Sequence, residues 1–217
     1  PPPPVTVWLY PDRGMKGRLI GAHGVIIARP WQSEIHMHGS KRPDPHLRHE
    51  MVHVLGAALA GGPFGVPLSP LPDTGLIEGL AVALGPHDTE ISLQGAAAGM
   101  LQAGSLPSID TLFSVRFSLG HGRRSYRAAG AFLQFIAQEK GWQPIIDAYR
   151  QGGLKTTDLD LKAWEQRWHA ALRDRPKELG ARRALIRGYS GHSVLDRACP
   201  NEVQAAWRHA QTKDPIS

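Results

Sequence analysis

The sequence predicts an α+β fold, with a small N-terminal β-sheet followed by a mostly helical bundle. Apolar and β-branched residues alternate with period two over parts of the first forty residues, and from about residue 45 they recur at helical spacing. Gly and Pro clusters then divide the helical part into segments. With 217 residues, 41% hydrophobic and 20% charged, the chain can bury the core of one ordinary domain.

Three strands are expected before residue 40. The first is Val5-Thr6-Val7-Trp8-Leu9-Tyr10, which alternates and breaks at the turn sequence of residues 11–14. Residues 25–28 and 34–38 are the other two, separated by Pro30 and closed by Gly39.

The helical part starts with a segment expected at 45–60, because Asp44 is a good cap and Pro45 suits the first helical position. A second helix, capped by Asp73 or Thr74, should run to Leu84. Further helices are expected at about 91–103, 124–140, 143–151 and 158–174. We therefore divide the chain into one domain over 1–176, with 1–4 as the stub of a tether, and a basic helical C-terminal appendage over 177–217.

Charge and cysteine content exclude several classes of protein. The net charge of +6 is concentrated toward the C-terminus, since residues 154–217 hold 12 basic and 8 acidic groups, and this is not the pattern of a nucleic-acid reader. We expect no nucleic-acid partner, and an acidic partner for the C-terminal helices is a minority hypothesis. The single cysteine, Cys199, excludes an internal disulfide framework and a multi-thiolate metal site.

No apolar run approaches the roughly 18 residues that a membrane span needs. The Pro1–Pro4 start without an initiator Met suggests the remainder of an extended tether. Export or membrane tethering through an upstream segment is one hypothesis, and the sequence leaves the compartment open.

The strongest functional signal is His49-Glu50-Met51-Val52-His53 on the first long helix. Residues four apart lie on one helix face, so both imidazoles can point at the same ion. Glu50 lies beside them, where it can take a proton from metal-bound water. This spacing predicts a zinc site with His49 and His53 as ligands.

A catalytic zinc needs a third protein ligand, and Glu78 is our candidate. It lies on the next helix among mostly apolar residues, where a lone carboxylate is costly unless it is paired or bound to metal. Gly79 and Ala81 are small and would let this helix pack closely against the first. We expect one Zn²⁺ per chain, held by His49, His53 and Glu78. His36 and His38 share a strand face, and we expect them near the site or facing solvent.

His49–His53, followed by Gly75-Leu76-Ile77-Glu78-Gly79-Leu80-Ala81, resembles the gluzincin (peptidase MA-like) branch of zinc metallopeptidases, the thermolysin- and aminopeptidase-like superfamily. Residues 125–133 with Gly141-Trp142 resemble the family segment in which a Tyr opens a helix, and 159–168 resemble its closing helix. The similarity covers about residues 20–174, and its metal motifs are the specific part.

The resemblance implies a peptidase mechanism in which a zinc-activated water attacks the peptide carbonyl and Glu50 is the general base. By similarity Tyr126 is the candidate oxyanion donor, and His121, Arg123 and Arg124 are the alternatives. Some members place an Asp four residues after the glutamate ligand to orient the first histidine, but Val82 stands there in this chain. Asp44, Asp73 or a backbone carbonyl could take that role.

Three functions remain open at this stage. A zinc peptidase leads, and endopeptidase is preferred because no Gly-x-Met-x-Asn motif marks an aminopeptidase. A catalytically silent zinc-binding interaction module is the first alternative, although it would not need Glu50. A metal-assisted amidase acting on a non-protein amide is the second.

Overall fold

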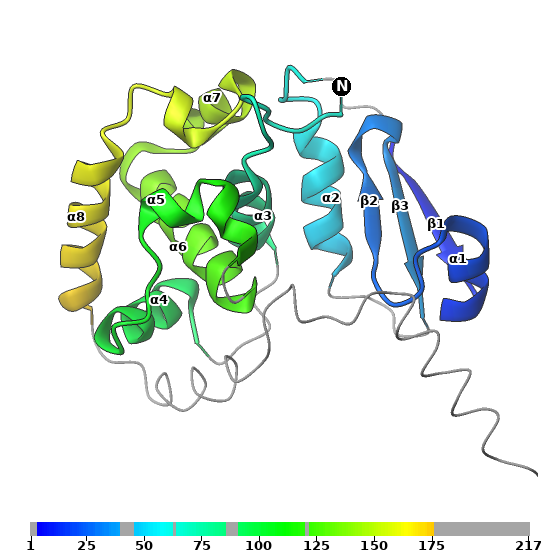
Figure 1. Ribbon diagram of the computed structural model, residues 1–217, viewed down its shortest axis with the longest axis horizontal. Coiled ribbons are helices and arrows are strands. Elements are labelled where there is room, and N and C mark those ends of the chain that lie inside the picture. The colour runs from blue at the N-terminus through cyan, green and yellow to red at the C-terminus, as the bar shows by residue number, and fades with distance from the viewer. Residues whose placement is uncertain (1–3, 40–45, 63, 86–90, 120–121, 176–217) are drawn as a thin grey trace, which may run out of the picture.

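The computed structural model describes residues 4–39, 46–62, 64–85, 91–119 and 122–175. It shows the expected α+β architecture, a three-stranded sheet followed by helices. Figure 1 shows the sheet at one end of the molecule, the helical bundle at the other, and α2 (Leu47–Gly56) between them. The expected appendage over 177–217 and the cap at Asp44 lie outside the described residues.

The sheet has the strand order β1-β3-β2, with β1 at Thr6–Tyr10, β3 at Glu34–His38 and β2 at Ile27–Arg29. β1 runs parallel to β3, while β2 runs antiparallel to it and forms one edge of the sheet. All three strands lie within two residues of their predicted positions, because period-two alternation follows directly from the pleat of a strand.

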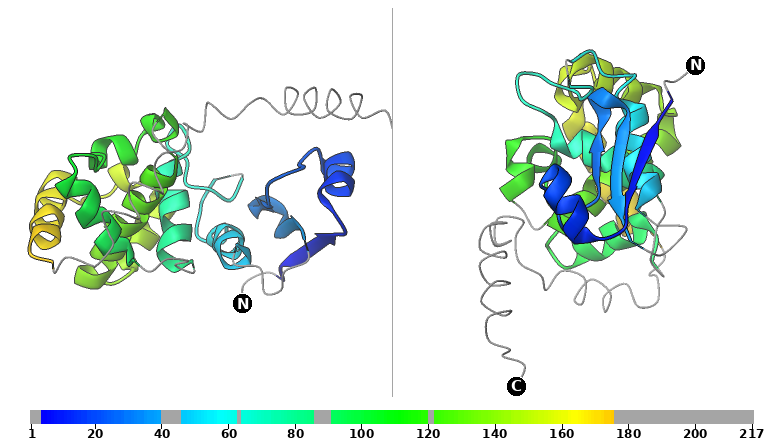
Figure 2. Two further views of the ribbon diagram at one scale, coloured as in Figure 1. Left: turned by 90° about the horizontal axis from the view of Figure 1, so that it is seen from below. Right: turned by 90° about the vertical axis from the view of Figure 1, so that its right-hand side faces the viewer.

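One element in this part was not predicted. Helix α1 (Arg13–Ile20) occupies the segment that we expected to be only a break after the first strand. The Asp12 side chain accepts a hydrogen bond from the Met15 backbone N–H at 2.8 Å, so this residue caps a helix instead of making a turn. Figure 2 shows α1 on the side of the sheet away from the bundle.

The bundle begins with α3 (Thr74–Leu84), which Asp73 caps as predicted. The remaining elements are α4, α5, η2, α6, α7, η3 and α8, at Leu93–Gln102, Ile109–Leu112, Val115–Leu119, Gly122–Lys140, Gln143–Gln151, Leu154–Thr156 and Leu161–Arg173. A short 3₁₀ turn, η1, follows β2 at Pro30–Gln32. The predicted helix over 45–60 is shorter in the structure, since α2 ends at Gly56 and turns follow.

Helix α3 is buried as predicted, but its small residues pack against a different helix. A Cβ built on Gly79 would lie 3.0 Å from the Ala129 Cβ of α6, and one built on Gly130 of α6 would lie 2.6 Å from a Val82 methyl. The glycines therefore let α3 approach α6, and the expectation that Gly79 admits α2 was wrong. Helices α3 and α6 form the centre of the main apolar cluster, which draws its fully buried side chains from the bundle.

Buried polar contacts fix the outer helices of the bundle. The Gln94 side chain of α4 donates to the Ala131 carbonyl at 2.7 Å and accepts from the Trp168 indole of α8 at 3.0 Å. The oxygen and the nitrogen of the Gln94 amide thus each have a partner, and these two hydrogen bonds join α4 to α6 and α8. None of the described helices has the length and apolar character needed to cross a bilayer.

Candidate metal centre

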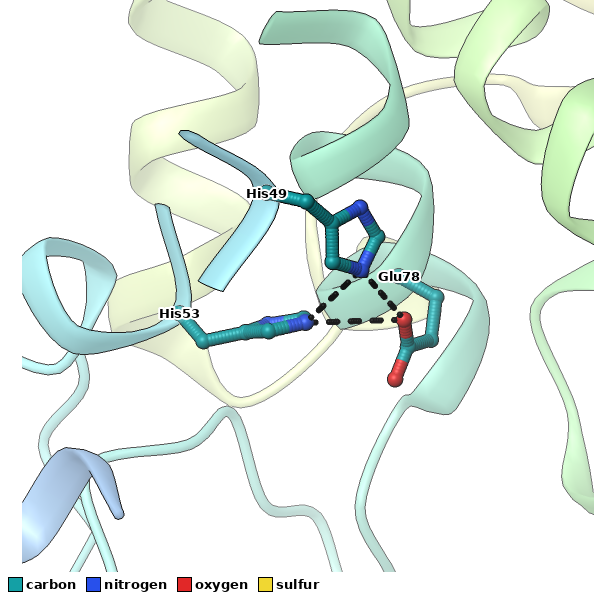
Figure 3. A group of neighbouring side chains, drawn as sticks. All are labelled: His49, His53 and Glu78. Atoms are coloured by element: carbon teal, nitrogen blue, oxygen red, sulfur yellow. Dashed lines mark hydrogen bonds and ion pairs between the residues drawn. The ribbon is translucent and has the colours of Figure 1, made fainter. Parts of the chain in front are cut away.

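His49 and His53 project from consecutive turns of α2 toward Glu78 on α3 (Figure 3). The two imidazole Nε2 atoms are 3.1 Å apart, and they lie 3.3 Å (His49) and 3.5 Å (His53) from the Glu78 Oε2. Their rings are nearly perpendicular, with an interplanar angle of 83°. Helical spacing brings the histidines together, and the packing of α2 on α3 adds the carboxylate.

These separations suit a tetrahedral zinc. Ligand atoms about 2.0–2.2 Å from a tetrahedral ion lie about 3.3–3.6 Å from one another. The three separations, 3.1, 3.3 and 3.5 Å, match this spacing to about 0.2 Å. Across the described residues, these three form the one group of three or more side chains that could hold a metal ion. The predicted ligand set is therefore brought together in the structure.

The charges within the group stabilise one another. Burial raises the pKa of the Glu78 carboxyl, but hydrogen bonds from His49 and His53 outweigh it and lower that pKa to about 2. Burial lowers the pKa of His53, and the neighbouring Glu78 and Glu50 carboxylates outweigh this and raise it. The carboxylate therefore stays charged and ready to bind a cation over a wide pH range.

Glu50 of α2 contacts the edge strand β2. Burial raises the pKa of its carboxyl, Glu78 raises it further, and His53, His49 and the Ala28 backbone N–H oppose the rise. A carboxylate with a raised pKa beside a metal site is suited to accepting and returning a proton. The contact with Ala28 also fixes Glu50 against β2, the edge strand.

A second buried charge close to this region escaped the sequence analysis. Lys16 of α1 is fully buried, and its ammonium donates to the Val25 carbonyl in the segment before β2. Burial lowers the pKa of Lys16, while the Glu50 carboxylate opposes this. An isolated lysine belongs to no sequence motif. Only the structure shows that Lys16 holds the segment that leads into the edge strand β2.

Other predicted residues have different surroundings. The Tyr126 ring packs against Phe117, with ring centroids 5.3 Å apart, and against the main apolar cluster, so its role as oxyanion donor stays a prediction. His121 lies outside the described residues, Arg123 is exposed, and Arg124 is partly buried. No described contact brings any of the four candidate oxyanion donors to the three ligands.

Asp73 does not take the part of a histidine-orienting group. Its two carboxylate oxygens accept from the Leu76 and Leu154 backbone N–H groups, each at 3.0 Å. It is instead the cap of α3 and a link from α3 to η3.

His36 is buried in the sheet, so the alternative that it faces solvent was wrong. The Tyr10 hydroxyl lies 2.9 Å from its Nδ1, and the Glu34 carboxylate lies 3.1 Å from its Nε2. His36 is therefore held by its own sheet, and His38 is half-buried at the end of the same strand.

Compared with known proteins, the chain matches no protein-family model, no curated protein and no solved structure. The geometry of the site and the sequence motifs are therefore what indicate a function.

Proposed function

We propose that this protein is a zinc-dependent peptidase of the gluzincin type, with one zinc held by His49, His53 and Glu78. The observation that carries the proposal is the convergence of two imidazole nitrogens and one carboxylate oxygen at the spacing of zinc ligands, with Glu50 beside them. Three protein ligands leave the fourth position of a tetrahedral ion open, which distinguishes a catalytic zinc from a structural one.

In this proposal His49, His53 and Glu78 bind the metal, and Glu50 transfers the proton. A zinc ion in such a site lowers the pKa of its water and polarises a carbonyl. Glu50 accepts a proton on its carboxylate and returns it to the leaving amine. Burial raises the pKa of the Glu50 carboxyl toward neutral pH, and a carboxyl with such a pKa both accepts and returns a proton more readily.

The edge strand supports a peptide as the substrate. β2 pairs only with β3 among the described strands, and apart from the Ala28 N–H that contacts Glu50, its outer backbone groups pair with no other described strand. Adding a strand to a sheet edge is a common way to bind a peptide. Because Ala28 of β2 contacts Glu50, a peptide lying along β2 would pass close to the proposed general base.

Replacing Glu50 with Gln tests the proposal. Wild-type protein should contain about one zinc per chain and cleave members of a peptide library. Glu50→Gln should fold normally and keep its zinc, because Glu50 is not a ligand, but should lose about 10²–10⁴-fold in cleavage rate. Glu139→Gln is the matched control, since Glu139 forms an exposed ion pair with Arg167.

Each alternative function has its own outcome in this experiment. Zinc binding without cleavage of any library member would favour the silent binding module, and cleavage of only non-peptide amides would favour the amidase. Equal cleavage by Glu50→Gln and wild type would show that the mechanism is wrong. Unchanged zinc content in Glu78→Ala would exclude the proposed ligand set.

A further inference from the structure

A buried tyrosine that no motif marks points its hydroxyl at the ligand-bearing face of α2. Tyr149 of α7 is 1% exposed. Its hydroxyl oxygen would lie 3.2 Å from a Cβ built on Gly56. Gly56 comes three residues after His53, so the two share a face of the helix. The hydroxyl therefore lies one turn beyond the second histidine ligand.

The glycine at this place makes room for the phenol. A glycine in the middle of a helix is destabilising relative to alanine. Gly56 does not have a positive φ, and the residue after it, Ala57, is also helical. The backbone conformation at position 56 would therefore allow any residue. The methyl group of an alanine at this position would instead press against the ring edge and the hydroxyl of Tyr149.

The Tyr149 hydroxyl is a hydrogen-bond donor that faces negative charge. Burial raises its pKa, and the Glu78 and Asp73 carboxylates raise it further. It therefore keeps its proton at physiological pH. Among the described residues, the Tyr149 hydroxyl forms no hydrogen bond, so its proton has no acceptor in the metal-free protein.

Of the two carboxylates near Tyr149, only Glu78 has an oxygen left to accept. Both oxygens of Asp73 already accept from buried backbone N–H groups at 3.0 Å. Glu78 directs Oε2 at the two histidines, and its Oε1 has no hydrogen-bond partner among the described residues. A carboxylate oxygen can accept from a neighbouring hydroxyl, so Oε1 is the acceptor that Glu78 still offers.

We propose that Tyr149 is a positioning residue, whose hydroxyl donates to Oε1 of Glu78 when the metal is bound and so holds Glu78 as a one-oxygen ligand. The inference rests on the proposed zinc site and deepens it. Carboxylates that bind a metal are generally held by a hydrogen bond of this kind.

Zinc affinity, measured by competition with a chromophoric chelator, tests the role without any substrate. Tyr149→Phe keeps the buried ring and removes only the donor. It should weaken zinc binding by about 10–100-fold. The visible bands of the cobalt(II)-loaded variant should also weaken, because a carboxylate released from the hydrogen bond can bind through both oxygens and raise the coordination number. Tyr10→Phe is the matched control, since its hydroxyl contacts His36 in the sheet.

Gly56→Ala separates positioning from general packing. The new methyl group would press on the Tyr149 oxygen at 3.2 Å, while alanine favours the helix. We expect weaker zinc binding with no loss of stability of the metal-free protein. In the Tyr149→Phe background the same change should cost no further affinity, because the oxygen it displaces is gone.

The outcomes distinguish this inference from the proposed function. Wild-type protein that binds no zinc overturns the metal site and the inference with it. Wild-type protein that binds zinc with the same affinity and cobalt spectrum as Tyr149→Phe overturns the role of Tyr149 and leaves the metal site standing. Affinity losses in Tyr149→Phe that merely track lost stability of the metal-free protein also overturn it.

Discussion

The metal-free protein should be most stable in mildly acidic solution, and Glu78 should cause this. In the folded chain the pKa of Glu78 falls from an ordinary 4.5 to about 2, so the ionised carboxylate stabilises the fold above 4.5 and that stabilisation is lost as pH falls toward 2. The pKa of His53 is raised above its ordinary 6.5, so its contribution is complete below 6.5 and is lost as pH rises through the raised value.

The size of the effect follows from the shift of Glu78. A change of 4.5 − 2 = 2.5 units corresponds to about 3 kcal/mol. The pKa shifts of Glu78 and His53 share the interaction between these two groups, so their free energies are not added together. We expect the full value between pH 4.5 and 6.5, where the carboxylate and the imidazolium are both charged.

Urea denaturation of chelator-treated protein across this pH range measures the effect. Wild type should show a maximum in the free energy of unfolding between 4.5 and 6.5, and Glu78→Gln should remove most of it. Glu139→Gln, which breaks an exposed pair with Arg167, should cost only about 0–1 kcal/mol. With zinc present the trend should reverse above pH 6.5, because protons compete with the metal for the histidines.

A chelator-treated wild type whose pH profile coincides with that of Glu78→Gln would refute this reasoning. It would mean that the three side chains do not interact in the metal-free protein, and that the metal has to assemble them.

Two further predictions concern the framework around the site. Asp73→Ala should lower the free energy of unfolding by about 2–4 kcal/mol, because the buried Leu76 and Leu154 N–H groups lose their acceptor. Asp73→Asn should lower it less in the same urea titration, because one acceptor oxygen remains. Gly79→Val should lower the free energy of unfolding by about 1–3 kcal/mol and weaken zinc binding, because its Cβ would lie 3.0 Å from the Ala129 Cβ and push α3 away from α6. Gly24 has open space around it, so the control Gly24→Val should leave the urea midpoint and the zinc affinity unchanged.

Local patterns were enough to predict most of the fold and the ligands. Strand alternation and helix periodicity each arise within a few residues, and His49 and His53 are neighbours on one helix by spacing alone. Glu78 needed one more step, the burial expected from its apolar neighbours, and the structure places it between both histidines.

The features that sequence reasoning missed depend on contacts between distant segments. Helix α1 was hidden by Gly14 and Gly17, which disfavour helices, yet a Cβ on Gly17 would lie 2.0 Å from the His23 ring, so packing requires this glycine. Tyr149 is separated from Gly56 by more than ninety residues of sequence, and no local pattern connects them. The same applies to the hydrogen bond from Leu154 to Asp73.

Because α2 lies between the sheet and the bundle, a zinc bound to it would connect these two parts of the molecule. Both histidines belong to a helix that contacts β2 and β3, whereas Glu78 belongs to a helix at the centre of the bundle. Ile35, Met37 and Val54 are buried outside the main apolar cluster, so the sheet side of the molecule has a small core of its own. A bound zinc would be a cross-link between these two cores, closing a loop of the 24 residues that lie between His53 and Glu78. Removing it would leave the packing of α2 on α3 and the contacts of Glu78 with the two histidines to join the cores, so the metal would strengthen the coupling between their unfolding.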